Sequence, residues 1–201
     1  MVKKTLLVGV LSLLVIAVTA AGVWMFGSSG ELRGTAYGEP YPPAPEFALT
    51  SGNGTEFRLS EMRGKIVLLF FGYTSCPDVC PTTMAELKAV TDKLGAEKSK
   101  NVKVILVTVD PERDTPQRMQ EYVNHFSKDF IGLTESEPVL AKVWSDYGIF
   151  RQIVDEQSAA GYGIDHTARI TLIDQDGNLR ASYGFDTPVD DIVHDLKLLQ
   201  E

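Results

Sequence analysis

Apolar residues form an unbroken run over residues 66–71, and a second β-rich run covers residues 102–109. Runs of this length and composition are typical of strands that are buried on both faces of a sheet. Between them, apolar side chains recur at helical spacing, at Met84, Leu87, Val90 and Leu94. Strand, helix and strand in this order predict a right-handed parallel crossover.

Three further helices are predicted from apolar side chains that recur at intervals of three and four residues. One follows Thr115 and Pro116, a typical N-cap and first-turn proline, and another ends at Gly148. The last follows Thr187 and Pro188. Their apolar positions are Met119, Tyr122, Val123 and Phe126; Leu140, Val143, Trp144 and Tyr147; and Val189, Ile192, Val193, Leu196 and Leu199.

Two hairpins are predicted at the turn pairs Asn53-Gly54 and Asp176-Gly177, which tolerate the positive φ angles of tight turns. The polar, glycine-containing residues 149–164 are expected to be irregular. The order of elements is therefore hairpin, βαβ unit, helices, hairpin and helix. This order is typical of an α/β thioredoxin-like three-layer sandwich with an N-terminal hairpin, in which helices cover both faces of a mixed sheet.

The N-terminal end predicts a membrane anchor. Residues 5–26 carry no charged side chain and follow Lys3 and Lys4; a helix of this length, about 33 Å, crosses a hydrocarbon core of about 30 Å. We interpret residues 1–26 as a single-pass transmembrane helix in the cell membrane, with its N-terminus in the cytoplasm. A cleaved signal is the alternative, because residues 18–21 offer small-residue cleavage sites. Either interpretation predicts an extracytoplasmic domain in a bacterial envelope.

Composition limits the remaining possibilities. Residues 27–44 are rich in Gly, Ser and Pro and are predicted to be a flexible linker, which leaves residues 45–201 as one domain. The chain of 201 residues has a net charge of -8 and no run of Lys and Arg, which argues against a nucleic-acid partner.

Both cysteines of the chain, Cys76 and Cys80, lie at the predicted turn from strand to helix. Free backbone N–H groups and the positive helix end favour thiolates there, so both sulfurs are expected to be available as anions. Their spacing allows them to bind one metal ion or to form a disulfide. An inert buried disulfide or a pair of core thiols is a third interpretation, which the intervening Pro77 and Asp78 do not favour.

Three histidines are candidates for a third ligand. His125 and His194 lie on polar helix faces and are expected to be solvated. His166 follows the irregular segment, where it is either a ligand beside the cysteines or an ordinary turn histidine. Two thiolates and one imidazole suit Cu(I), and Cu(II) with a weak further ligand, whereas structural zinc sites usually have four protein ligands. Asp78 is left open as a ligand, a helix cap or a solvated side chain.

Three segments together resemble the SCO/SenC family: FGYTSCPDVCP at residues 71–81, VDPERDTP at residues 109–116 and DHTARITLID at residues 165–174. Members are membrane-tethered, thioredoxin-like proteins that bind copper and assist assembly of the dinuclear copper centre of cytochrome c oxidase. The resemblance implies that Cys76, Cys80 and His166 are copper ligands. It also implies that residues 110–116 shape a loop near the site.

Two functions are consistent with these features. One is a copper metallochaperone that serves the copper-bearing subunit of cytochrome c oxidase and requires an upstream copper donor and a thiol reductant. The other is an enzyme, an extracytoplasmic thiol:disulfide oxidoreductase. Three residues separate the cysteines instead of two, and no proline occurs from Val139 to Thr187, where thioredoxin-type enzymes carry a cis-proline. These two departures favour the chaperone.

Overall fold

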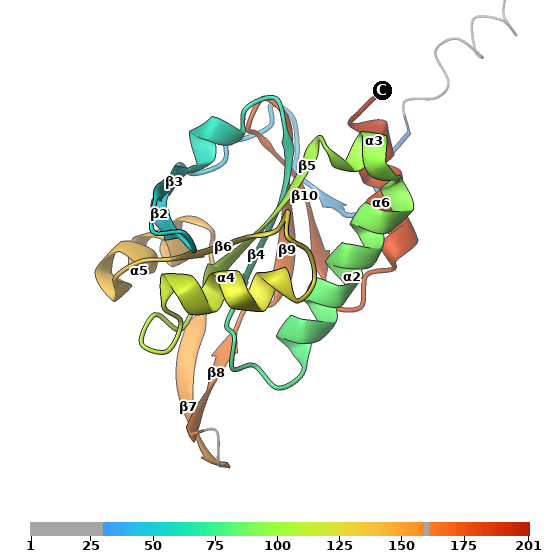
Figure 1. The fold of residues 1–201 in the computed structure, drawn as a ribbon. Coiled ribbons are helices and arrows are strands. Elements are labelled where there is room, and N and C mark those ends of the chain that lie inside the picture. Colours follow the sequence, from blue (N-terminus) through green and yellow to red (C-terminus); the bar gives the residue numbers. More distant parts are fainter. Residues whose placement is uncertain (1–29, 159–160) are drawn as a thin grey trace, which may run out of the picture. The chain divides into compact units, whose positions relative to one another are not determined.

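The computed structural model describes residues 30–158 and 161–201 (Figure 1). One compact unit spans Leu32–Glu201. Among the described residues, no helix is both long enough and apolar enough to cross a membrane. The anchor expected over residues 1–26 lies outside the described residues.

A mixed eight-stranded sheet forms the centre of this unit, in the order β1-β10-β9-β4-β5-β6-β2-β3. β4 and β5 are parallel, as are β5 and β6, whereas β9 runs antiparallel to β4. The parallel crossover predicted from the two apolar runs is therefore confirmed. The bounds are β1 Thr35–Ala36, β2 Ala48–Ser51, β3 Glu56–Arg58, β4 Ile66–Gly72, β5 Val102–Thr108, β6 Ile131–Thr134, β9 Arg169–Ile173 and β10 Leu179–Gly184.

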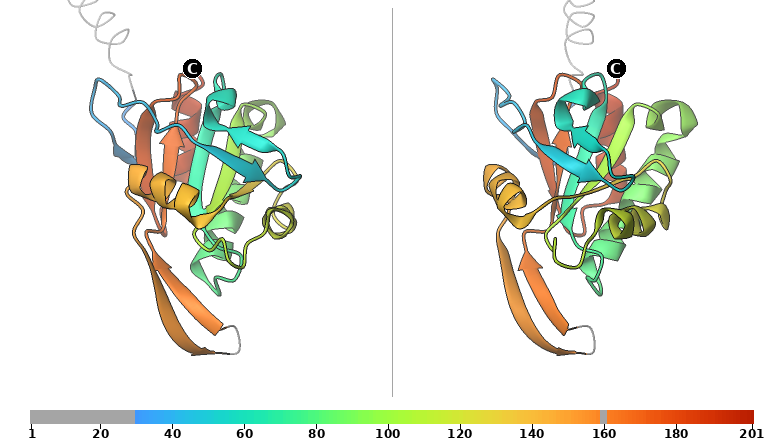
Figure 2. Two further views of the ribbon diagram at one scale, coloured as in Figure 1. Left: turned by 90° about the vertical axis from the view of Figure 1, so that its left-hand side faces the viewer. Right: turned by 60° about the vertical axis from the view of Figure 1, so that its left-hand side comes forward.

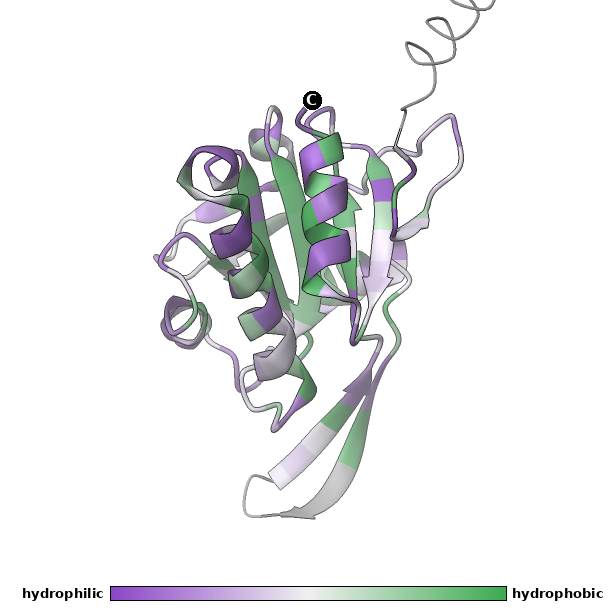
Figure 3. Cartoon of the chain, turned by 90° about the vertical axis from the view of Figure 1, so that its right-hand side faces the viewer, coloured by the Kyte–Doolittle hydropathy of each residue, from purple (hydrophilic) through white to green (hydrophobic). Residues whose placement is uncertain are grey.

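Helices cover both faces of the sheet. Figure 3 shows α2 and α6 side by side over strands of mainly hydrophobic residues, and Figure 2 shows α5 on the opposite face. The side chain of Thr115 accepts a hydrogen bond from the amide of Arg118 at 3.3 Å, and Pro116 begins α4, as the cap signal predicts. The helices are α2 Val79–Leu94, α3 Ala96–Ser99, α4 Pro116–Asn124, α5 Glu137–Asp146 and α6 Val189–Leu198, with a 3-10 turn, η1, at Leu59–Met62.

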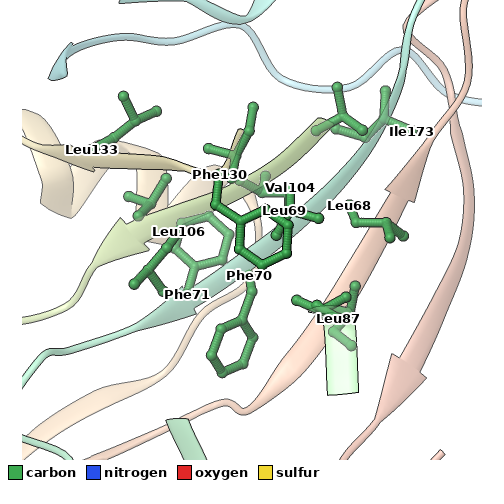
Figure 4. Close-up of a cluster of buried hydrophobic side chains, with 14 of the residues drawn as sticks. Leu68, Leu69, Phe70, Phe71, Leu87, Val104, Leu106, Phe130, Leu133 and Ile173 are labelled. Atoms are coloured by element: carbon green, nitrogen blue, oxygen red, sulfur yellow. The ribbon is translucent and has the colours of Figure 1, made fainter. Parts of the chain in front are cut away.

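Every residue of β4 is buried, and neighbouring side chains point to opposite faces (Figure 4). Phe71 meets Tyr147 at the end of α5, with ring centroids 5.5 Å apart. Gly72 faces α2, where a Cβ atom would lie 2.9 Å from the sulfur of Cys80. Glycine at this position therefore allows the first turn of α2 to approach the end of β4 closely.

Both predicted hairpins are present, as β2–β3 and β9–β10. The segment that was expected to be irregular instead forms a third hairpin, made of β7 (Arg151–Ser158) and β8 (Gly161–His166). This hairpin is a sheet of its own and extends away from the central sheet (Figure 2). His166 is thus the last residue of a strand, and the expectation that it ends an irregular loop is wrong.

Part of the predicted linker also belongs to the domain, which begins at Leu32 and not at Pro45. β1 pairs with β10, and the buried carboxylate of Asp195 accepts hydrogen bonds from the amides of Arg33 at 2.8 Å and Gly34 at 2.9 Å. A side chain on Gly34 would collide with the ring of Tyr183. Composition alone did not indicate these long-range contacts.

Replacing Asp195 with alanine is expected to lower the free energy of unfolding by about 3 kcal/mol, because the amides of Arg33 and Gly34 and the buried hydroxyl of Tyr183 lose their shared acceptor. Tyr183→Phe removes one of these bonds and should cost about 1 kcal/mol. Urea denaturation of both variants tests the difference. Equal losses would show that the carboxylate does not hold the N-terminal segment.

Candidate metal centre

The two cysteines lie where β4 ends and α2 begins. Cys76 is half-buried in the connecting loop, whereas Cys80 is fully buried in the first turn of α2. The amide of Cys80 donates a hydrogen bond to the sulfur of Cys76 at 3.4 Å, and both thiols are free. The first turn of the helix therefore binds the more exposed sulfur through its backbone.

The third candidate, His166, meets the cysteines from the base of the β7–β8 hairpin. Its Nε2 atom lies 3.7 Å from the sulfur of Cys80. Its Nδ1 atom lies 3.2 Å from the carbonyl oxygen of Thr167. A carbonyl oxygen can only accept, so Nδ1 carries the proton and the Nε2 lone pair faces Cys80. The fold thus brings together residues 86 positions apart in the sequence.

The described part of the chain contains no group of three His, Cys, Asp or Glu side chains arranged as a complete metal site. Cys80 and His166 converge, and Cys76 lies beside them. Asp78 is exposed at the N-cap of α2, and its side chain makes no capping hydrogen bond. The other two histidines lie elsewhere: His125 is exposed, whereas His194 donates from Nδ1 to Asp195 at 2.9 Å and is less solvated than expected.

The two sulfurs differ in acidity. A hydrogen bond from the Cys80 thiol, together with backbone amides, lowers the pKa of Cys76 to about 5. The neighbouring Cys76 sulfur and burial raise the pKa of Cys80. The expectation that both sulfurs are anions is therefore wrong for Cys80, because an adjacent thiolate and a dry environment both disfavour a second negative charge.

Burial also lowers the pKa of His166, which keeps its imidazole neutral at pH 7. A neutral imidazole with its proton on Nδ1 presents a lone pair at Nε2, the form in which histidine binds metals. The site thus contains one thiolate, one buried thiol and one oriented imidazole.

The loop of residues 110–116 supports the cysteine loop, which agrees with the role implied by the resemblance. The buried carboxylate of Asp114 accepts hydrogen bonds from the amide of Thr74 at 3.1 Å and from its hydroxyl at 2.5 Å. Arg118 donates to the hydroxyls of Thr74 at 2.7 Å and Ser75 at 2.9 Å. Sequence reasoning identified the segment, but neither Asp114 nor Arg118 was recognised as a support.

A family model described as SCO1/SenC matches residues 36–201. The chain belongs to the SCO1/SenC family. The matched range includes both cysteines, His166 and the supporting loop. Among the relatives, this SCO1/SenC chain is 33% identical to an SCO2-like protein of Rickettsia felis over 153 residues, which are 76% of this chain and 74% of the relative. The matches span 66% to 74% of the bacterial relatives' lengths.

Solved SCO structures share the fold. Bradyrhizobium japonicum ScoI with copper bound is 36% identical, with a TM-score of 0.71 over 78% of this chain and 99% of that one. Sco1 of Thermus thermophilus is 37% identical, with a TM-score of 0.76 over 86% and 99%. These similarities confirm the thioredoxin-like α/β fold of this SCO1/SenC domain.

Proposed function

We propose that this SCO1/SenC chain is a copper metallochaperone. It binds one copper ion through Cys76, Cys80 and His166 and delivers it to, or prepares, the dinuclear copper site of cytochrome c oxidase. The observation that carries the proposal is the distance of 3.7 Å between Nε2 of His166 and the sulfur of Cys80. Similarity to ScoI with copper bound supports the choice of metal.

The spacing of these two donors suits a single metal ion. A metal ion that lies about 2.3 Å from sulfur and about 2.0 Å from nitrogen, with an angle of about 120° between the two bonds, places the donor atoms about 3.7 Å apart. Cys76 completes the set when its side chain turns toward the metal. Two sulfurs and one nitrogen are soft donors in a low-coordinate arrangement, which favours Cu(I). The bond between His166 and the carbonyl of Thr167 keeps the imidazole oriented during binding.

Unequal burial of the ligands supports release by ligand exchange. Cys76 is half-buried and Cys80 is fully buried, so an acceptor thiolate has access to the metal from the side of Cys76. Copper binding requires both cysteines to be reduced, and the domain therefore depends on a thiol reductant as well as on an upstream copper donor. In this proposal, residues 1–26 anchor the chain in the cell membrane and the domain is extracytoplasmic.

A second function, thiol:disulfide exchange, is favoured by the same asymmetry. The thiolate of Cys76 is accessible for attack on a partner disulfide, and Cys80 lies behind it to resolve the mixed disulfide. This reaction would reduce the partner's cysteines and oxidise Cys76 and Cys80 to a disulfide. Such a reductase would prepare an acceptor copper site without carrying copper.

Copper loading of the fully reduced chain under anaerobic conditions distinguishes the two functions. One bound copper ion that protects both thiols from alkylation is the result expected for the chaperone. His166→Ala should weaken copper binding roughly 100-fold, because one of three ligands is lost. No bound copper, together with rapid reduction of a disulfide-containing peptide, would overturn the chaperone and support the reductase.

A further inference from the structure

We propose that Arg113, with Asp110 and Tyr162, is a positioning residue that holds β8 against the domain and thereby keeps His166 in front of Cys80. The inference rests on the proposed function, because His166 is a copper ligand only in that proposal. The three side chains meet at Tyr162, four residues before His166 on the same strand. They act through the strand that carries it.

The position of β8 requires such an attachment. β7 and β8 form a two-stranded sheet separate from the central one, and a hairpin of two strands is marginally stable by itself. Its apolar burial is limited: Ile164 is 5% exposed, but its cross-strand partner Ile153 is 47% exposed. The location of His166 at the end of β8 therefore depends on polar contacts with the rest of the domain.

Arg113 makes three kinds of contact, which join it to Asp110 and Tyr162. Its Nε atom forms an ion pair with the buried carboxylate of Asp110. Its Nη1 atom donates a hydrogen bond to the carbonyl oxygen of Tyr162 at 2.9 Å, and its guanidinium group stacks 3.8 Å from the centre of the Tyr162 ring. The hydroxyl of Tyr162 donates to the other oxygen of Asp110 at 2.8 Å, which closes the cluster.

Tyr73 extends this cluster to the histidine. The guanidinium group of Arg113 lies 5.7 Å from the centre of the Tyr73 ring. The hydroxyl of Tyr73 accepts a hydrogen bond from the amide of Ile164 at 3.3 Å, and its ring meets His166 edge to face, with centroids 5.9 Å apart. Tyr162, Ile164 and His166 are alternate residues of β8 and therefore share one face. Holding Tyr162 and Ile164 in place thus also holds His166.

β7, the partner strand of β8, is also attached to the domain beside His166. Arg151 pairs with His166 across the hairpin, and its Nε atom donates to the carbonyl oxygen of Val109 at 2.6 Å. Both strands are therefore bound to the segment that follows β5, with Arg113 on the β8 side. Loss of Arg113 would leave the buried carboxylate of Asp110 without its cation and β8 without its guanidinium contacts.

Copper affinity of Arg113→Gln, measured in the full chain with and without His166→Ala, tests this role. Partners that orient a metal ligand typically contribute about 10-fold to 100-fold to metal affinity, and we expect a loss of that size in the wild-type background. In the His166→Ala background the same substitution should cost nothing further, because the ligand through which it acts is absent. Arg113→Lys should rescue only partly, since an ammonium group lacks the planar fork and the stacking surface.

Arg180 provides a matched control. It pairs with the buried Asp174 at 3.2 Å and stacks 4.0 Å from the ring of Tyr41, and its side chain is 20% exposed, compared with 18% for Arg113. Arg180→Gln should lower stability to a similar extent without changing copper affinity. An equal loss of affinity in Arg180→Gln, or an equal effect of Arg113→Gln with and without His166, would overturn the positioning role.

Amide hydrogen exchange of the chain without copper separates this inference from the proposed function. The Ile164 amide should exchange faster in Arg113→Gln than in wild type, whereas Arg180→Gln should leave it unchanged. Unchanged exchange in Arg113→Gln would overturn the hold on β8. Failure of the wild-type chain to bind copper would overturn the proposed function instead, and the exchange result would still decide whether Arg113 holds β8.

Discussion

Cys80→Ala is expected to reduce copper affinity roughly 1000-fold, the largest loss for any single substitution in the site. Cys80 is the fully buried one of the three proposed ligands, and its sulfur faces the lone pair of His166. Losing it removes a soft donor and the partner that shares the metal with the imidazole. A metal site held by a few protein ligands loses about 4 kcal/mol with one strong ligand, which corresponds to this fold-change. Competition with a Cu(I) chelator measures the loss.

Cys80→Ser is the control that nearly keeps the size of the side chain and changes its donor atom. Serine keeps a small polar side chain against Gly72 but offers a hard oxygen donor, which Cu(I) binds poorly. Both variants should therefore lose copper, while the cost of the small cavity left by alanine is about 1 kcal/mol in unfolding free energy. Retention of wild-type affinity by either variant would exclude Cys80 as a ligand.

The central sheet could be predicted from the sequence because each of its main strands and helices is indicated by the pattern of its own residues. β4 and β5 are apolar runs, and the helices that cover them carry apolar side chains at helical spacing. The turn pairs Asn53-Gly54 and Asp176-Gly177 likewise indicate their hairpins without any knowledge of distant residues. Each of these segments has one structure that both its own pattern and the fold favour.

The β7–β8 hairpin could not be predicted in this way. Its residues show no regular alternation, and its contacts with the rest of the domain are long-range, such as the hydrogen bond between Arg113 and Tyr162, 49 positions apart. The proximity of His166 to Cys80 has the same origin, since the end of β8 is located by contacts with the loops after β4 and β5. The difference between the two sulfurs also depends on burial, which spacing along the chain does not show.

The difference in acidity between Cys76 and Cys80 leads to the second large effect. Cys76 is expected to react with iodoacetamide at a rate that is constant from about pH 6 to pH 8 and falls tenfold per pH unit below about pH 5, while Cys80 stays unmodified. The sign follows from the lowered pKa of about 5: the thiolate persists above that value and is protonated as the pH falls through it. The alkylation rate of an ordinary thiol, with a pKa of about 8.5, would instead fall with decreasing pH throughout this range. Mass spectrometry of the alkylated protein assigns the modified residue.

The two Cys80 variants identify the cause of the lowered pKa. The principal contribution is the hydrogen bond that the Cys80 side chain donates to the Cys76 thiolate. Cys80→Ala removes this donor, so the midpoint of the Cys76 profile should rise toward the ordinary value. Cys80→Ser keeps an O–H donor at the same place, and the midpoint should stay low although copper binding is lost. A midpoint that is low in both variants would assign the shift to the backbone amides of the first turn of α2 instead.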